Sequence, residues 1–224
     1  WRRPGLDAAR AGLGRLAALV RDEPLLAAEL ARLESPVRDP AGWRHLWFLG
    51  QSRIFESVRA DGRDAIRIAM RDDLAILQKA APFALVPGTR LTWEWKIDSL
   101  PAQVAEDTLP THDYISLAVE FENGKDLSYF WSCALPVGHA FACPIPTWTA
   151  RETHFVLRSG GEGLGRWVRE SRDLYADCVG IYGSPPARIV AIWLIAVSSF
   201  RRGRGDALVA DITLEAAGER LVVL

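Results

Sequence analysis

Three ionisable side chains at the start of one predicted strand are the residues best suited to acid–base chemistry. His112 and Asp113 end a loop, and Glu120 lies further along the strand that comes next. A positioned imidazole or carboxylate can act as a general acid or base. Neighbouring residues on a strand point to opposite faces, so His112 and Asp113 are not expected to act on each other. We take all three as catalytic candidates; the alternative is a turn-capping Asp113 and a surface His112.

The stretch from Asp113 to Cys133 is typical of a β-hairpin. Asn123-Gly124 is the strongest short signal for a two-residue type I′ turn. Such a turn would place Glu120 opposite Leu127 and Ser116 opposite Trp131. One face would then carry a core set, Ile115, Leu117, Val119, Phe121 and Phe130. The other would carry Tyr114, Ser116, Ala118, Glu120, Tyr129 and Trp131.

This second face mixes large rings with small residues and one carboxylate. Small residues opposite Tyr129 and Trp131 would leave space beside the rings, as the floor of a ligand pocket needs. We predict that Tyr114, Ser116, Tyr129 and Trp131 bind a ligand and that Glu120 anchors it. The alternative is that a second layer covers this face and the aromatic rings only fill it.

A second charged group lies later in the sequence. Glu170 and Arg172 are two apart on a predicted strand and share its face, while Arg158 lies on the strand before. Arg158 and Arg172 could bind an anion through two hydrogen bonds, or the group could form a structural network of ion pairs. We add Arg158 and Arg172 to the ligand-binding candidates, with Trp95 from the strand at 91–97.

The sequence predicts no metal site and no cofactor. His139 and Cys143 have i, i+4 spacing, but Pro144 and the surrounding loop offer no helix to align them. The glycine-rich run at 160–165 is predicted to be the turn that joins strands 154–158 and 167–173 as a pair, and it does not open a helix, so it is not a phosphate loop. No nucleophile elbow is present.

Two kinds of element surround these residues. Apolar residues at helical spacing predict two short helices within residues 6–34, a hairpin that covers the sandwich, forms a homodimer or docks a protein partner. We therefore divide the chain into a helical hairpin, 1–36, and a β-sandwich domain, 40–224.

After residue 40 short strands recur, among them 65–70, 91–97, 154–158, 167–173 and 189–197, with a short helix or turn at 175–182. The loops 98–112 and 134–150 are long enough to wall a pocket. This pattern predicts an all-β sandwich of jelly-roll-like topology.

Composition excludes several classes of function. The chain has 224 residues and a net charge of −1, which argues against general nucleic-acid binding. The uncharged run at 127–150 contains three prolines, so it does not predict a membrane span. Three cysteines leave an odd thiol under any pairing and favour a reducing, cytoplasmic compartment. The chain does not begin with Met, so an upstream signal segment is also compatible with it.

The run of landmarks resembles a bacterial family, the domain of unknown function numbered 3047, itself similar to the galactose-binding-like sandwich of complex I intermediate-associated proteins. The resemblance covers roughly residues 43–215. It rests on Ala65–Ile68, Leu91–Lys96, Asp113-Tyr114, Leu127–Ser132, Arg158–Gly160, Trp167–Asp173, Asp177 and Tyr182-Gly183. It implies a sandwich fold. The chain departs from the family's pattern in two places. His112-Asp113 and Leu117 replace paired acids and an arginine, and Val197–Phe200, followed by Arg201 and Arg202, replaces an acidic turn. The resemblance therefore implies that part of the family's acidic site is missing here.

We therefore expect a protein that binds a small molecule in an aromatic-lined pocket. One alternative is a cyclase or isomerase of bacterial secondary metabolism that relies on shape and a single acid or base. Another is an interaction module that docks through its N-terminal helices.

Overall fold

The computed structural model describes residues 11–12, 15, 39–46 and 52–224. The chain divides into two compact units, Trp1–Arg38 and Asp39–Leu224. The predicted helical hairpin lies outside the described residues except for residues 11, 12 and 15, which are helical. The hairpin therefore stays a prediction.

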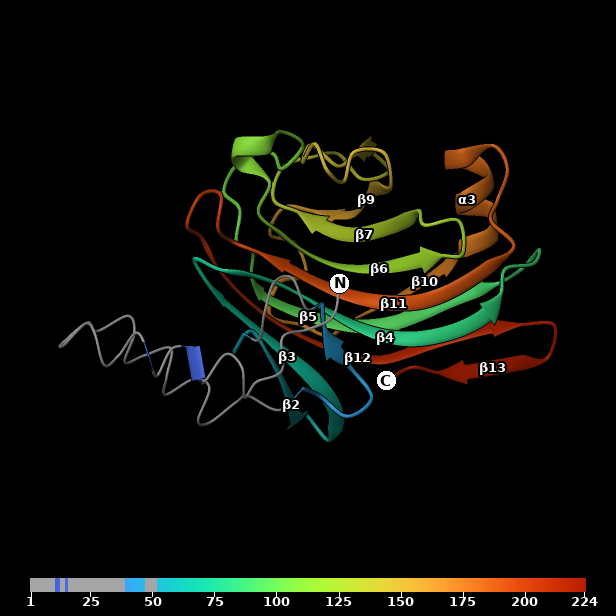
Figure 1. Cartoon of the computed structure of the whole chain (residues 1–224), viewed down its shortest axis with the longest axis horizontal. Helices are drawn as coiled ribbons and strands as arrows, with labels where there is room; N and C mark the ends of the chain where they lie inside the picture. Colours follow the sequence, from blue (N-terminus) through green and yellow to red (C-terminus); the bar gives the residue numbers. More distant parts are fainter. Residues whose placement is uncertain (1–10, 13–14, 16–38, 47–51) are drawn as a thin grey trace. The chain divides into compact units, whose positions relative to one another are not determined.

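The second unit is a sandwich of two sheets (Figure 1), which confirms the predicted all-β fold. The seven-stranded sheet has the order β1 (Arg44–His45), β4 (Leu74–Ala84), β11 (Arg188–Val197), β6 (Tyr114–Phe121), β7 (Asp126–Ser132), β9 (Glu152–Ser159), β8 (Ala140–Ala142). The six-stranded sheet has the order β10 (Val168–Asp173), β5 (Arg90–Ser99), β12 (Arg204–Ala216), β3 (Arg63–Arg71), β2 (Phe55–Ala60), with β13 (Glu219–Val222) beside β12. Helix α3 (Leu174–Tyr182) comes after β10, and a short 3-10 helix spans Leu109–Thr111. No helix within these described ranges is long and apolar enough to cross a membrane.

The core between the sheets results from strand alternation. Leu91, Trp93, Trp95 and Ile97 are all fully buried on one face of β5, as the period of two predicts. Strand β11 is buried on both faces, as its unbroken apolar run predicts. One face of β11 packs in the core between the sheets, and the other packs in the second apolar cluster beneath the covering loops.

The outer face of the seven-stranded sheet is covered by loops. Tyr114, Phe130 and Trp193 on this face pack against Leu135, Phe141 and Trp148 from the segment between β7 and β9. The segment between β5 and β6 contributes His112, which contacts the ring of Tyr114. The two long segments predicted to wall a pocket therefore lie on the sheet itself.

The central hairpin forms, but its predicted register is wrong. The N–H of Phe121 donates to the carbonyl of Lys125 at 2.9 Å, so three residues form the loop rather than two. Gly124 has φ +76°, whereas Asn123 is not left-handed and its Oδ1 accepts the N–H of Lys125 at 3.0 Å. A three-residue loop that ends in a left-handed glycine is the next most common hairpin connection.

This one-residue difference changes which side chains share a face. Glu120 pairs with Asp126 and Ser116 with Phe130. Tyr129 and Trp131 therefore point between the sheets, and Phe130 points outward, because a slip of one residue exchanges the two faces of a strand. The aromatic floor predicted on the outer face does not form from Tyr129 and Trp131.

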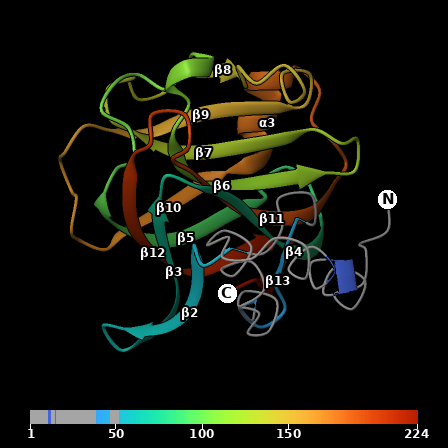
Figure 2. The ribbon, with the colours of Figure 1, turned by 60° about the vertical axis from the view of Figure 1, so that its left-hand side comes forward.

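A second prediction about pairing is also wrong. Strand β9 pairs in parallel with β7 in the seven-stranded sheet, and β10 pairs with β5 in the six-stranded sheet. The glycine-rich segment between them is an open loop that passes from one sheet to the other (Figure 2). Gly160, Gly163 and Gly165 all have positive φ, a backbone conformation that glycine adopts without steric cost.

Candidate functional site

The predicted aromatic ligand residues are core residues. Tyr129, Trp131 and Trp95 are at most 1% exposed and lie in the core between the sheets. The hydroxyl of Tyr129 donates to Asp177 Oδ2 at 2.6 Å, and Trp95 Nε1 donates to Glu170 Oε1 at 3.1 Å. These rings have polar partners within the protein, which is how buried tyrosines and tryptophans are normally accommodated.

Asp113 has a structural partner. Its two carboxylate oxygens accept the backbone N–H groups of Phe200 at 2.9 Å and Arg201 at 2.8 Å. Burial raises the pKa of Asp113, and these two hydrogen bonds oppose the shift. The side chain therefore caps the turn between β11 and β12, the capping role held as the alternative above, although the capped turn is distant in sequence.

His112 is fully buried and does not lie at the surface. Its Nδ1 lies 2.6 Å from the carbonyl oxygen of Glu106, and its ring packs against Tyr114 and His154. Burial and the neighbouring His154 lower the pKa of His112 to about 4, so the ring is neutral near pH 7.

Glu120 is the acid–base candidate that remains accessible. Its side chain is 21% exposed on the outer face of the sheet. Oε2 accepts hydrogen bonds from Gln78 Nε2 at 2.9 Å and Trp193 Nε1 at 3.1 Å, and Arg151 lies 3.7 Å from Oε1. Ser116 lies further along the same face, where its hydroxyl accepts from Ser128 at 2.8 Å. The Glu120 carboxylate is thus held in one orientation by two neutral donors and has the charged Arg151 beside it.

A hollow lies where the glycine-rich loop leaves the sandwich. It is a cavity of about 480 Å³, within the range of about 300–1,000 Å³ usual for small-molecule sites. Two arginines, one glutamate and one tryptophan meet there. Its lining consists of Val137, Leu157, Arg158, Ser159, Glu162, Gly163, Arg166, Trp167 and Val168.

Arg158 is fixed in the cavity wall. Its Nε donates to the buried carboxylate of Glu170, and its guanidinium lies 5.5 Å from the centre of the Trp131 ring. Within the described part of the chain, its two terminal nitrogens have no hydrogen-bond partner. The arginine is therefore held in place through one nitrogen and keeps its planar fork free for a ligand.

The back of the cavity needs a glycine. Gly163 has φ +91°, and a Cβ at this position would lie 3.0 Å from Cη2 of Trp131. Trp131 Nε1 also donates to the carbonyl of Gly160 at 2.9 Å, so this side chain contacts the loop at two of its glycines. Trp131 thus belongs to the site as the support of its loop rather than as an exposed surface.

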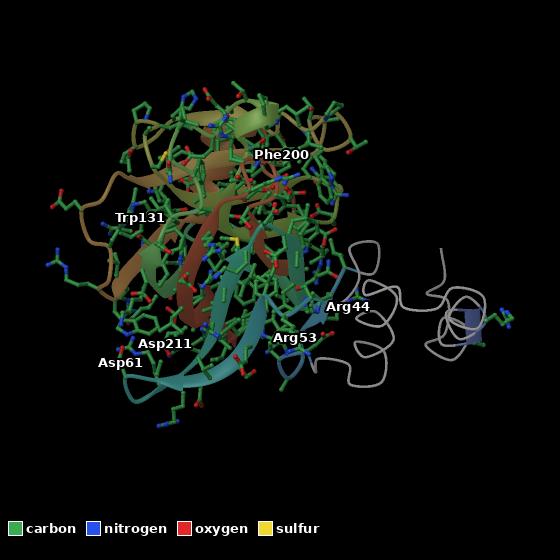
Figure 3. All side chains as sticks on the ribbon, turned by 90° about the vertical axis from the view of Figure 1, so that its left-hand side faces the viewer. Arg44, Arg53, Asp61, Trp131, Phe200 and Asp211 are labelled. Atoms are coloured by element: carbon green, nitrogen blue, oxygen red, sulfur yellow. The ribbon has the colours of Figure 1, made fainter. Side chains whose placement is uncertain are left out.

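The tryptophan of the cavity is also held in place. Trp167 Nε1 donates to Asp61 Oδ2 at 2.8 Å, and the guanidinium of Arg63 lies 4.6 Å from the centre of its ring. Asp61, labelled in Figure 3, belongs to the turn between β2 and β3. This hydrogen bond, followed by the charge of Lys96, lowers the pKa of Asp61.

The structure brings together only part of the predicted set. Arg158 lines the cavity, whereas Arg172 pairs with Asp177 and does not line it. Arg166, Trp167 and Glu162 were missed because the glycine-rich loop was interpreted as a connector. The signal available in the sequence was Arg166 and Trp167, with Arg158 just before them, in a loop that has more glycines than a hairpin needs.

Three solved structures illustrate what the fold is similar to. The xyloglucanase domain of NopAA, a type three effector from Sinorhizobium fredii, is 10% identical, covering 80% of this chain and 95% of that one, with a TM-score of 0.46. The family 12 xyloglucanase from Bacillus licheniformis is 8% identical, with coverages of 81% and 87% and a TM-score of 0.42. The family 11 carbohydrate-binding module of the cellulase Lic26A-Cel5E of Clostridium thermocellum is 11% identical, with coverages of 83% and 92% and a TM-score of 0.35. At these values the similarity carries no inference about ligand or activity.

A comparison with curated proteins found no match. The sequence profile described as "Protein of unknown function (DUF3047)" matches residues 41–213, which are most of the chain and nearly all of the sandwich. This confirms the resemblance seen in the sequence. The chain belongs to the DUF3047 family.

Proposed function

We propose that this protein binds a small anionic molecule in the cavity between β9, β10 and the glycine-rich loop. The observation that carries the proposal is the state of Arg158. A guanidinium that is anchored through Nε and has free terminal nitrogens is prepared to accept a carboxylate or phosphate with two parallel hydrogen bonds.

The rest of the lining supports an anion with an apolar portion. Arg166 is exposed and has no ion-pair partner among the described residues, so it adds a second positive charge. Leu157, Val137 and Val168 supply apolar surface, and Trp167 supplies a rigid ring. Sites of this composition use a few polar groups to orient a ligand that apolar groups bury.

Ligand specificity would come from Glu162 and Ser159. Glu162 is an exposed carboxylate at the rim with no ion pair in the described part of the chain. It would repel a ligand with several negative charges on that side and accept a hydrogen bond from a hydroxyl. The favoured class is therefore a hydroxylated organic acid or a sugar phosphate.

The experiment is a titration monitored by intrinsic tryptophan fluorescence. The probes are inorganic phosphate and a panel of hydroxy acids, sugar acids and sugar phosphates. We expect a saturable change with at least one organic anion. The affinity for that anion should fall by roughly ten-fold or more in Arg166→Gln, because a hydrogen bond to a charged group contributes about 1.5–3 kcal/mol.

A matched control lies on the next strand. Arg169→Gln removes an exposed arginine of β10 that does not line the cavity, and it should bind the same anion as the wild type does. Arg158→Lys keeps the charge and loses the fork, so it should weaken binding while leaving Glu170 paired. Equal loss in Arg169→Gln and Arg166→Gln, or no saturable change with any anion, would refute the site.

One observation favours an enzyme as the second candidate. Glu120 is a half-buried carboxylate held by Trp193 and Gln78 at the edge of the loop-covered face, and it would be the single acid or base of the cyclase or isomerase expected from the sequence. Glu120→Gln keeps the shape and the acceptor for Trp193. It should abolish turnover of any substrate identified for this protein and leave binding in the arginine-lined cavity unchanged.

A further inference from the structure

Two histidines and a cysteine from three separate segments meet beneath the loops that cover the seven-stranded sheet. His112 precedes β6, Cys143 comes just after β8, and His154 lies on β9. One ligand atom from each lies within 4.8 Å of the other two, and all three residues are fully buried. Imidazole nitrogen and thiolate sulfur are the ligands that Zn²⁺ prefers in proteins.

The distance between two of these atoms fits one edge of a tetrahedral zinc site. Cys143 Sγ lies 3.5 Å from His112 Nε2. Bonds of about 2.3 Å to sulfur and about 2.0–2.1 Å to nitrogen, at a tetrahedral angle, separate the two atoms by about 3.5 Å. A hydrogen bond from the thiol to the ring would give the same distance, so this edge alone does not distinguish the two arrangements.

His154 supplies the independent observation. Both of its ring nitrogens are buried and neither has a hydrogen-bond partner within the described part of the chain. Glu152 Oε1 lies 3.5 Å from Nε2, which is too long for a good hydrogen bond. A fully buried polar atom without a partner costs about 1–3 kcal/mol, so such atoms are rare in native proteins. A hydrogen bond between the thiol and His112 leaves this ring unexplained, whereas a cation at the centre of the cluster would give one of its two nitrogens a partner.

The surroundings of His112 are those of a metal ligand. Its Nδ1–H donates to the carbonyl of Glu106 at 2.6 Å, which leaves the lone pair of Nε2 facing Cys143. Histidines that bind metals almost always donate their second ring N–H to a carboxylate or a carbonyl in this way. The carboxylate of Glu106 in turn accepts the hydroxyl of Ser132 and the N–H of Cys133, at 2.7 Å for the latter, so the orienting carbonyl is itself fixed.

A fourth ligand is available from the same strand as His154. Glu152 is 3% exposed, and its Oε1 lies 3.5 Å from His154 Nε2 and 3.4 Å from the hydroxyl of Tyr114. We propose that His112, Cys143, His154 and Glu152 bind one Zn²⁺ ion as a closed, structural site. Cys143 binds as the thiolate, so uptake of the metal releases its proton to solvent.

The expected role of the ion is to fasten the covering loops to the sheet. His112 comes from the segment between β5 and β6, Cys143 from the segment between β7 and β9, and the other two ligands from β9. All four ligands are buried, so the site has no open position for a substrate. This inference is independent of the arginine-lined cavity, which shares no residue with the cluster.

The first test uses the wild-type chain alone. Protein purified without a chelator should contain about one zinc ion per chain by inductively coupled plasma mass spectrometry. Removing the ion should lower the melting temperature, and added Zn²⁺ should restore it, because a ligand that binds only the folded state stabilises it. A zinc-free chain whose melting temperature is unchanged by excess Zn²⁺ would overturn the proposal.

The second test assigns the ligands and has a matched control. Loading with Co²⁺ should give a thiolate-to-cobalt charge-transfer band in the wild type and in Cys133→Ser, because Cys133 lies outside the cluster. Cys143→Ser should lose the band. His154→Gln should lower zinc affinity by more than roughly 100-fold, because loss of a residue that only hydrogen-bonds to a metal ligand typically costs roughly 10- to 100-fold. His139→Gln, on the same covering loop, should keep both the cobalt band and the wild-type affinity for zinc. A band that survives in Cys143→Ser would refute the assignment.

Discussion

The hydroxyl of Tyr129 donates to Asp177 Oδ2 at 2.6 Å and joins the middle of β7 to helix α3. Tyr129 is fully buried, and Asp177 also pairs with Arg172. We expect Tyr129→Phe to lower the free energy of unfolding by about 1.5–3 kcal/mol, because a buried hydrogen bond to a charged acceptor is lost. Urea denaturation would measure this.

The control for Tyr129 is a second tyrosine that packs against the same core. Tyr175 is half-buried and has no hydrogen bond through its hydroxyl among the described residues, so Tyr175→Phe should change stability by less than about 0.5 kcal/mol. Equal effects of the two changes would show that the hydrogen bond to Asp177 contributes little.

The loop that forms the cavity should be sensitive to one glycine and tolerant at its neighbour. Gly163→Ala places a Cβ at positive φ, 3.0 Å from Trp131, and should destabilise the protein by about 1–3 kcal/mol. Gly161 has no left-handed φ and open space around it, so Gly161→Ala should be close to neutral. Thermal unfolding of the two variants checks this, and a neutral Gly163→Ala would contradict the close packing of this loop on Trp131.

Asp126 gives the stability of the protein a defined pH dependence. Burial and then the carboxylate of Glu152, the residue beside it on β9, raise the pKa of Asp126 to about 8, although Arg151 opposes the shift. Because this folded-state pKa lies above the usual value of 3.8, the folded protein holds an extra proton between about pH 4 and pH 8. Stability should therefore fall as pH rises through that window, by up to about 1.4 kcal/mol per pH unit, and level off above it.

The isosteric variant separates this group from all others. Asp126→Asn carries no charge at any pH, so its stability relative to the wild type should increase from about pH 5 to about pH 8. Chemical denaturation of both proteins at the two pH values measures the difference. A constant difference would mean that Asp126 is already ionised at the lower pH.

The cysteines should react slowly in the folded protein. Cys143 and Cys178 are buried, and Cys133 is only half-buried. Burial, followed by the charge of Glu106, raises the pKa of Cys133 to about 12, so little of it is thiolate near pH 8. Iodoacetamide should modify the native chain far more slowly than it modifies free cysteine, and all three thiols should react in denaturant. Rapid modification of native Cys133 would contradict the raised pKa.

Several elements were predictable from local patterns. The alternation in Leu91–Ile97 predicted a strand with one buried face, and the unbroken apolar run at 189–197 predicted a central strand. Asn123-Gly124 predicted a hairpin, and a short helix or turn was expected at 175–182, where helix α3 lies. These features depend on residues close in sequence, whose side-chain periodicity sets which face meets the core.

Only the tertiary structure decided the site. A three-residue loop in place of a two-residue loop sent Tyr129 and Trp131 into the core, since the period of a strand is two and one residue exchanges its faces. Because β9 pairs with β7 and not with β10, the glycine-rich loop passes between the two sheets, where its residues line the cavity. His112, Cys143 and His154 have no metal-binding spacing, and they meet because covering loops from two parts of the chain fold onto one strand. Contacts of this kind depend on how sheets and loops pack in three dimensions, which no local pattern in the sequence specifies.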